Sequence, residues 1–163
     1  MDATLDDASL LAQFEARTLP AKAWTHQAHL RVALLYTKDR GPDAAVETLR
    51  HTIPRLNDAH GVPNSETRGY HETITVAWVR VLASALADDT GCDSGKTGTL
   101  DWLRLHPDLL TARALDRHYS PALIRSPAAR TAFVEPGLVP LPTWEAGRSA
   151  PARQRGVPNA RSG

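Results

Sequence analysis

The chain has 163 residues, enough for one domain with a sizeable core, and a second domain is not expected. Its 19 basic and 18 acidic side chains leave a net charge of +1, which argues against a body-wide surface for nucleic acid or membrane. Cys92 is the only cysteine, so an internal disulfide is excluded, and no apolar run approaches the ~18 residues of a membrane span. The acidic start, MDATLDDASLL, is unlike a signal peptide, so we expect a cytoplasmic protein.

The first part of the chain carries apolar residues at helical spacing. This periodicity predicts helices over residues 7–16, 23–40 and 42–57. Gly41 is typical of the end of a helix, and Pro42 suits the first turn of the next one. Pro54 is expected to kink the third helix, because proline removes a backbone hydrogen bond.

Residues 71–85 allow two interpretations. Between residues 73 and 78, Ile, Val and Trp alternate with Thr and Ala as in a strand, and β-branched residues favour sheets. No other segment offers itself as a pairing strand, whereas the helical stripe from His71 through Trp78 and Leu82 is unbroken. We therefore expect a helix, which follows a turn-rich segment over residues 59–69.

Shorter helices are predicted in the rest of the chain. They cover residues 100–105 and 108–117, and the steps Ser120-Pro121 and Ser126-Pro127 each supply an N-cap and a first-turn proline. The GKT of the polar loop 88–99 lacks the upstream glycine and the strand of a phosphate-binding loop, so no nucleotide cofactor is expected. The fold class is therefore all-α, a single globular domain of about six or seven helices.

The C-terminal segment is rich in proline and poor in apolar residues after Pro136, which predicts an extended strap to about residue 142. Residues 144–163 contain four arginines and one acid, so residues 1–143 are mildly acidic. We expect a helical domain over residues 1–143 and a flexible basic tail over residues 144–163.

Three histidines stand at the start of apolar helical stripes. His26 and His29 are three residues apart, so both imidazoles lie on one helix face with Cβ atoms about 5–6 Å apart. His71 begins another helix. The positive end of a helix dipole keeps an imidazole uncharged, which is the form that binds a metal or acts as a base. We predict that the three histidines bind one divalent transition metal or zinc ion.

The His-x-x-His motif is of low specificity, and a structural alternative stays open. In that alternative the histidines donate and accept hydrogen bonds with backbone carbonyls or tyrosine hydroxyls in the core. His118 is a candidate fourth ligand or a helix-end cation.

Glu72 and Tyr70 are the candidate catalytic residues. Glu72 follows His71 and would orient a ligand or act as a base toward bound water, or it is an ordinary first-turn carboxylate. Tyr70 would donate a hydrogen bond into the same region, and the alternative for it is aromatic core.

Arg130, Tyr119 and Trp24 are the candidate substrate-binding residues. Arg130 either pairs with an acid such as Glu72 or holds a substrate carboxylate or phosphate. Tyr119 is a second candidate hydrogen-bond donor, and the alternative is that it is a buried aromatic residue of the core. Trp24 lies just before the histidine pair in the sequence.

Several segments resemble an uncharacterised family of small bacterial proteins that carry W-T-H-x-A-H-L, G-Y-H-E-T-I-T, Y-x-S, S-x-x-A-R and P-D-L-x-P-L-P. The matching segments here are WTHQAHL at 24–30, GYHETIT at 69–75, Tyr119-Ser120, SPAAR at 126–130 and PGLVPLP at 136–142. Gly137 stands where the family pattern has Asp, and Tyr119-Ser120 lacks the intervening residue. The resemblance implies that the histidine-bearing segments form a recurring unit, and it implies no reaction and no metal.

These residues lead us to expect a metal-dependent enzyme for a small, anionic metabolite, acting by hydrolysis or hydration through metal-bound water or by oxygen chemistry. One alternative is a metal-independent enzyme with a histidine as base beside Glu72. A second is a non-enzymatic helical module that binds a ligand or a partner and has structural histidines. The expected partner is a small molecule, neither membrane nor nucleic acid is expected, and a homo-oligomer stays open.

Overall fold

The structure is a computed structural model that describes residues 4–89 and 97–143. Within these residues every regular element is helical, with seven α-helices and no strand, so the predicted all-α fold is confirmed. Cys92 and the predicted flexible tail at 144–163 lie outside the described residues. The tail therefore stays a prediction.

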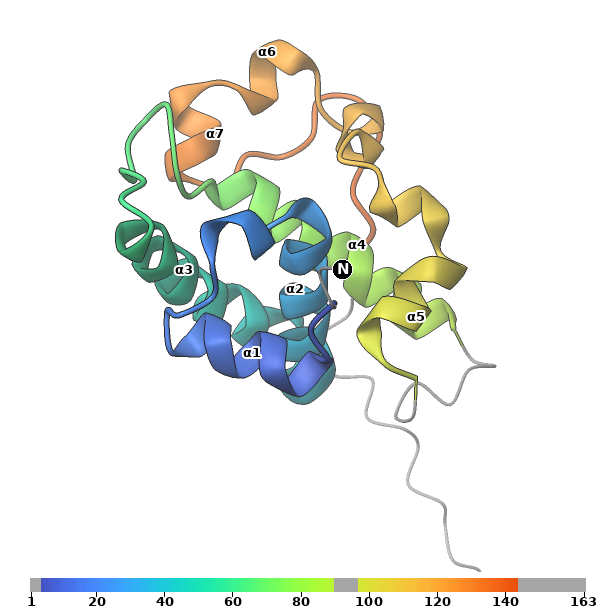
Figure 1. Ribbon diagram of the computed structural model, residues 1–163. Helices are drawn as coiled ribbons and strands as arrows, with labels where there is room; N and C mark the ends of the chain where they lie inside the picture. The colour runs from blue at the N-terminus through green and yellow to red at the C-terminus, as the bar shows by residue number, and fades with distance from the viewer. Residues whose placement is uncertain (1–3, 90–96, 144–163) are drawn as a thin grey trace, which may run out of the picture.

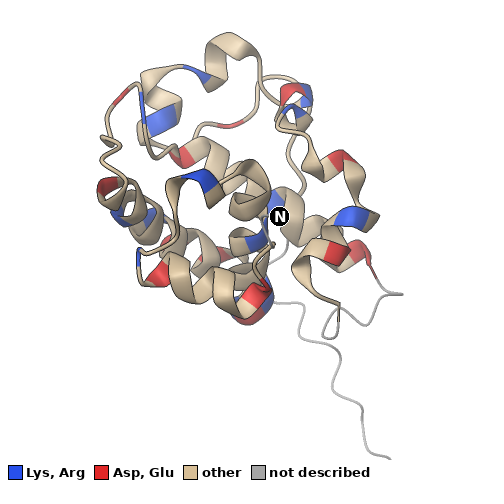
Figure 2. Cartoon of the chain, viewed as in Figure 1, with Lys and Arg blue, Asp and Glu red and all other residues tan. Residues whose placement is uncertain are grey.

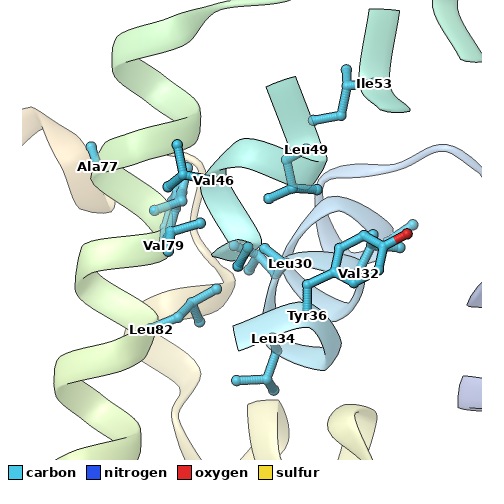
Figure 3. Close-up of a cluster of buried hydrophobic side chains, with 14 of the residues drawn as sticks. Leu30, Val32, Leu34, Tyr36, Val46, Leu49, Ile53, Ala77, Val79 and Leu82 are labelled. Atoms are coloured by element: carbon cyan, nitrogen blue, oxygen red, sulfur yellow. The ribbon is translucent and has the colours of Figure 1, made fainter. Parts of the chain in front are cut away.

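Three long helices carry most of the core. They are α2 (His26–Arg40), α3 (Pro42–Ala59) and α4 (Glu72–Asp88), which pack against one another, with α1 (Asp7–Glu15) against α2 (Figure 1). Leu30 of α2, Leu49 of α3 and Leu82 of α4 are almost completely buried between them (Figure 3). Burial of each such side chain contributes about 1.5–3 kcal/mol to folding.

The boundaries of α2 and α3 follow the local signals in the sequence. The Thr25 hydroxyl accepts a hydrogen bond from the Ala28 N–H at 3.3 Å and caps the start of α2. Gly41, with φ +81°, ends α2 in a backbone conformation that favours glycine, and Pro42 begins α3. Pro54 lies inside α3, which continues to Ala59, two residues beyond the predicted end.

The segment that alternates like a strand is helical, as predicted. His71 is the N-cap of α4. The buried side chains of α4 recur at helical spacing, among them Thr73, Val76, Val79 and Leu82. Because this stripe packs on both α2 and α3, tertiary burial outweighs the β propensity of its Thr, Ile and Val residues.

Short helices complete the chain. They are η1 (Ala21–Ala23), α5 (Thr99–Leu105), η2 (Pro107–Leu110), η3 (Ala114–Arg117), α6 (Pro121–Ile124) and α7 (Pro127–Thr131). The single helix predicted over residues 108–117 is wrong, because two 3-10 turns occupy this region. The predicted Ser-Pro caps are confirmed: the hydroxyls of Ser120 and Ser126 accept hydrogen bonds from the N–H groups of Leu123 and Ala129.

Helix α7 packs against α4, and the strap after it returns to η3. The N–H groups of Leu138 and Val139 donate to the carbonyls of His118 and Arg117, at 3.1 and 3.3 Å. Positive and negative side chains are interspersed along the helices in Figure 2. In the described part of the chain no helix is both long and apolar enough to cross a bilayer.

Candidate functional site

A cleft of about 370 Å³ lies where α2 and α4 begin, beside the C-terminal half of α3 and next to α7. Five of the residues predicted from the sequence line it: Trp24, His29, Tyr70, His71 and Arg130. They come from three separate segments of the sequence, and the packing of α2, α4 and α7 brings these segments together. The cleft is therefore the candidate functional site.

His29 has one nitrogen in use and one available. Its Nδ1 donates a hydrogen bond to the Thr25 carbonyl at 2.7 Å, which fixes the proton on Nδ1 because a carbonyl only accepts. Its Nε2 then carries a lone pair, and this atom has no hydrogen-bond partner among residues 4–89 and 97–143. Burial lowers the pKa of His29 to about 4, with a smaller effect of His26 in the same direction, although the Thr25 hydrogen bond opposes it. His29 is therefore uncharged at neutral pH.

The ring of His29 stacks on Trp24, with centroids 3.7 Å apart and an interplanar angle of 29°. Trp24 also contacts the core, because its ring lies 5.0 Å from that of the buried Phe14. Trp24 thus lines the cleft and orients His29, which supports its predicted place in the site.

His71 uses both ring nitrogens to join segments of the fold. Nδ1 accepts from the Ile74 N–H at 3.3 Å as the N-cap of α4, and Nε2 donates to the Ile124 carbonyl at 2.8 Å. Burial lowers its pKa, and the nearby charge of Arg130 adds to the shift. Binding of a metal to this ring would require one of the two hydrogen bonds to break.

His26 does not line the cleft. Its ring lies 5.1 Å from that of Trp78, burial lowers its pKa, and its Nε2 is buried with no hydrogen-bond partner in the described residues. No group of three or more His, Cys, Asp or Glu side chains in residues 4–89 and 97–143 is placed to hold a metal ion. The residues present do not fit a three-histidine site in this arrangement, and the metal stays a prediction without support from these contacts.

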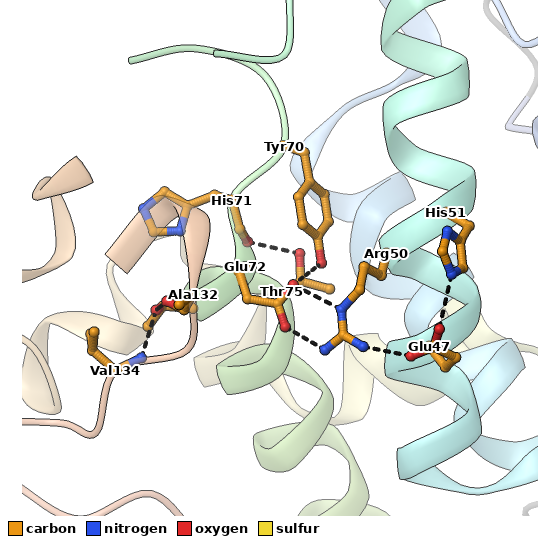
Figure 4. A network of polar contacts seen from close by, with 10 residues as sticks. Glu47, Arg50, His51, Tyr70, His71, Glu72, Thr75, Ala132 and Val134 are labelled. Carbon is orange, nitrogen blue, oxygen red and sulfur yellow. Dashed lines mark hydrogen bonds and ion pairs between the residues drawn. The ribbon is translucent and has the colours of Figure 1, made fainter. Parts of the chain in front are cut away.

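Glu72 is bound by Arg50, a residue to which the sequence analysis assigned no role. The Nη2 and Nε atoms of Arg50 lie 2.5 and 3.2 Å from the two Glu72 oxygens, and the Tyr70 hydroxyl donates to Oε2 at 2.8 Å (Figure 4). Burial raises the pKa of Glu72, but the hydrogen bonds from Arg50 and Tyr70 outweigh it and the net shift is downward. Glu72 is therefore an ionised carboxylate with both oxygens engaged, which disfavours its predicted role as a base.

Tyr70 is among the residues that line the cleft, and its hydroxyl belongs to the same network as Arg50 and Glu72. Burial raises the pKa of Tyr70, and the hydrogen bond to Glu72 raises it further, so the hydroxyl stays protonated and donates to the carboxylate. The network extends from Arg50 to Glu47 and His51 on the exposed face of α3 (Figure 4). It connects the first turn of α4 to the middle of α3.

Arg130 holds backbone carbonyls rather than an acid. Its Nη1 donates to the carbonyls of Gly69 and Tyr70, at 3.1 and 3.2 Å. Of the two alternatives for Arg130, the pairing with Glu72 is not found, because Arg50 binds that carboxylate. In the described residues the Nε and Nη2 atoms of Arg130 have no protein partner, and the side chain lines the cleft.

Two residues of the turn before α4 fix the carbonyls that Arg130 binds. Gly69 has φ +84°, and a Cβ there would lie 2.6 Å from the Pro63 carbonyl oxygen, so only glycine fits. The Asn64 side chain accepts from the N–H of Tyr70 and from the amide of Asn57, both at 3.0 Å. The sequence predicted a turn here, but it gave no signal for these partners.

Two further predicted residues lie elsewhere. Tyr119 is 1 % exposed, does not line the cleft and donates to the Val134 carbonyl at 3.0 Å, so the core alternative describes it and its substrate-binding role is not supported. Burial raises its pKa to about 12, with a further contribution from Glu135. The Nδ1 of His118 lies 2.8 Å from the Val139 carbonyl and holds the strap.

Comparison with family models, curated proteins and solved structures found no match to this chain. Inference about its function therefore depends on the cleft itself.

Proposed function

We propose that the protein binds a small organic anion in this cleft and that Arg130 holds the negatively charged group. The proposal depends on the hydrogen bonds of the Arg130 guanidinium. Its Nη1 atom donates to two carbonyls, whereas its Nε and Nη2 atoms have no partner in the described residues. This edge of arginine forms two parallel hydrogen bonds with a carboxylate or a phosphate.

The electrostatics of the cleft support an anionic ligand. His29 lies in the first turn of α2 and His71 is the N-cap of α4, so the positive ends of two helix dipoles lie at the cleft. Both histidines are shifted toward the uncharged form, and no Asp or Glu is among the described residues that line the cleft. Arg130 is therefore the charged lining side chain, and a monoanion would neutralise it.

A second candidate function is acid–base catalysis on the bound anion by His29. The fixed Nδ1 proton leaves the Nε2 lone pair to accept a proton from a substrate or from water, as a histidine base requires. A negative charge bound beside His29 would raise its pKa from about 4 toward the operating pH. This candidate corresponds to the metal-independent alternative, with His29 in place of His71 and without Glu72 as its partner. The metal-dependent reaction has no comparable support.

Calorimetric titration with acetate, benzoate and inorganic phosphate tests the proposed function. We expect saturable binding of at least one of these anions to the wild type and loss of most of that affinity in Arg130→Gln. Arg125→Gln is the matched control, because Arg125 is an exposed arginine five residues away that does not line the cleft. Arg130→Lys keeps a positive charge without the planar fork, and it should bind more weakly than the wild type and more tightly than Arg130→Gln. Equal affinity of the wild type and a folded Arg130→Gln would refute the proposal.

A further inference from the structure

A series of aromatic rings ends at the cleft. Phe14 and Trp24 have centroids 5.0 Å apart, and Trp24 and His29 have centroids 3.7 Å apart, each pair with rings about 30° from parallel. Phe14 is buried in the core, whereas Trp24 and His29 line the cleft. Within residues 4–89 and 97–143 no aromatic ring other than Trp24 contacts His29. The series of ring contacts therefore begins in the core with the tilted pair of Phe14 and Trp24, and it ends with the stacked pair of Trp24 and His29.

The contacts of His29 define what it can present to a ligand. One face is covered by Trp24, and the edge with Nδ1 is used by the Thr25 carbonyl. These contacts leave the opposite face and the edge with Nε2 unused, and His29 is among the residues that line the cleft. An uncharged imidazole is a good platform for a second flat ring, because stacking on it does not require a cation to lose its hydration.

The remaining walls are apolar at several points. Ile53, Val62 and Ile74 line the cleft beside the aromatic pair, and Arg130 contributes the cationic group from α7. A volume of about 370 Å³ is near the lower end of small-molecule sites, which measure roughly 300–1,000 Å³. The size suits a ligand with one ring and an anionic group better than a nucleotide.

From these observations we infer that the ligand is a flat, one-ring aromatic carboxylate, whose ring extends the stack of Trp24 and His29 and whose carboxylate binds the Nε and Nη2 atoms of Arg130. The inference rests on the proposed binding of an anion and names its chemical class. The apolar walls alone would accept any ring of similar size. The aromatic stack is the feature that favours a flat one.

Benzoate and cyclohexanecarboxylate provide the test, because they share charge and ring size and differ in flatness. We expect calorimetry to give a dissociation constant for benzoate that is roughly three- to tenfold lower than that for cyclohexanecarboxylate. The affinity for acetate should be lower than that for either ring compound. In NMR spectra of the wild type, benzoate should shift the carbon-bound ring protons of His29 through its ring current, and cyclohexanecarboxylate should not.

The outcomes separate this inference from the proposed function. Equal or tighter binding of cyclohexanecarboxylate, or unshifted His29 ring protons in saturating benzoate, would overturn the aromatic class and leave the anion site intact. Binding of inorganic phosphate without binding of benzoate would do the same. Absence of binding by all four anions would overturn both proposals. A folded Trp24→Leu variant should show a smaller preference for benzoate over cyclohexanecarboxylate than the wild type, and an unchanged preference would count against the aromatic contacts of His29.

Discussion

His71 and Ile124 are joined by a hydrogen bond of 2.8 Å from the imidazole Nε2 to the backbone carbonyl, which ties the start of α4 to the end of α6. The other nitrogen of His71 caps α4. His71, which the sequence suggested as a metal ligand, thus uses both ring nitrogens in hydrogen bonds that hold the fold together. The residue proposed to bind the anion is instead Arg130, which lies six residues after Ile124.

The histidine at position 71 should matter for stability. His71→Ala removes the N-cap and the bond to Ile124, and we expect a loss of about 1–3 kcal/mol in the free energy of unfolding. His71→Asn should recover part of that loss, because asparagine is a good N-cap. Urea denaturation measures both. Stoichiometric metal in wild-type protein purified without a His tag, lost in a fully stable His71→Ala, would instead support the predicted metal site.

Stability should also depend on pH through His29. Its pKa in the folded protein, about 4, is lower than the ordinary value of 6.5, so the unfolded chain binds more protons between these values. Stability is therefore fully present above pH 6.5 and falls as the pH drops toward 4, by on the order of 3 kcal/mol from this residue. The lowered pKa values of His26 and His71 add loss in the same direction.

The variant His29→Gln isolates that contribution. Denaturation at pH 7, 5.5 and 4.5 should show a smaller loss of stability than in the wild type, because glutamine does not titrate. Parallel pH profiles of the two proteins would mean that the burial of His29 does not set its pKa.

The pair of Arg50 and Glu72 gives a third prediction. Glu72→Gln should lower stability by about 1–2 kcal/mol, because the Glu72 side chain is only 9 % exposed and the Tyr70 hydroxyl loses a charged acceptor. Glu47→Gln is the control on the same arginine, and it should cost much less than Glu72→Gln because that pair is exposed and screened by water. Anion affinity should be unchanged in both. If Glu72→Gln abolished anion binding while stability stayed at the wild-type level, Glu72 would have a direct role in the binding site.

Two glycines with positive φ offer a matched comparison. Gly41 has φ +81°, ψ 165° and open space around it, so alanine meets backbone strain there but no collision and should cost about 1–3 kcal/mol. At Gly69 the same strain is joined by a collision with the Pro63 carbonyl, so Gly69→Ala should cost about 3 kcal/mol or more. Only Gly69→Ala should weaken anion binding, because the carbonyl of residue 69 accepts a hydrogen bond from Arg130 and positions that side chain. Equal effects of the two substitutions on stability and binding would contradict this account of the turn.

The sequence was sufficient for the parts of the fold that depend on local patterns. Helical periodicity, Gly41 and the two Ser-Pro steps located the main helices, and the segments around His29, His71 and Arg130 marked the walls of the cleft. The roles of these residues were not accessible in the same way. The bond of His71 to Ile124 spans 53 residues and the pair of Arg50 and Glu72 spans 22, and no local pattern specifies such partners.

The Nε and Nη2 edge of Arg130 is where the proposed anion would bind, so its NMR signal reports binding directly. The side-chain Nε–H resonance of Arg130, assigned in the nitrogen-labelled protein, should move downfield and saturate as benzoate is added, together with the backbone amide of Tyr70. The resonance of the exposed Arg125 should stay in place. Saturable binding of the anion with an unmoved Arg130 resonance would contradict the account.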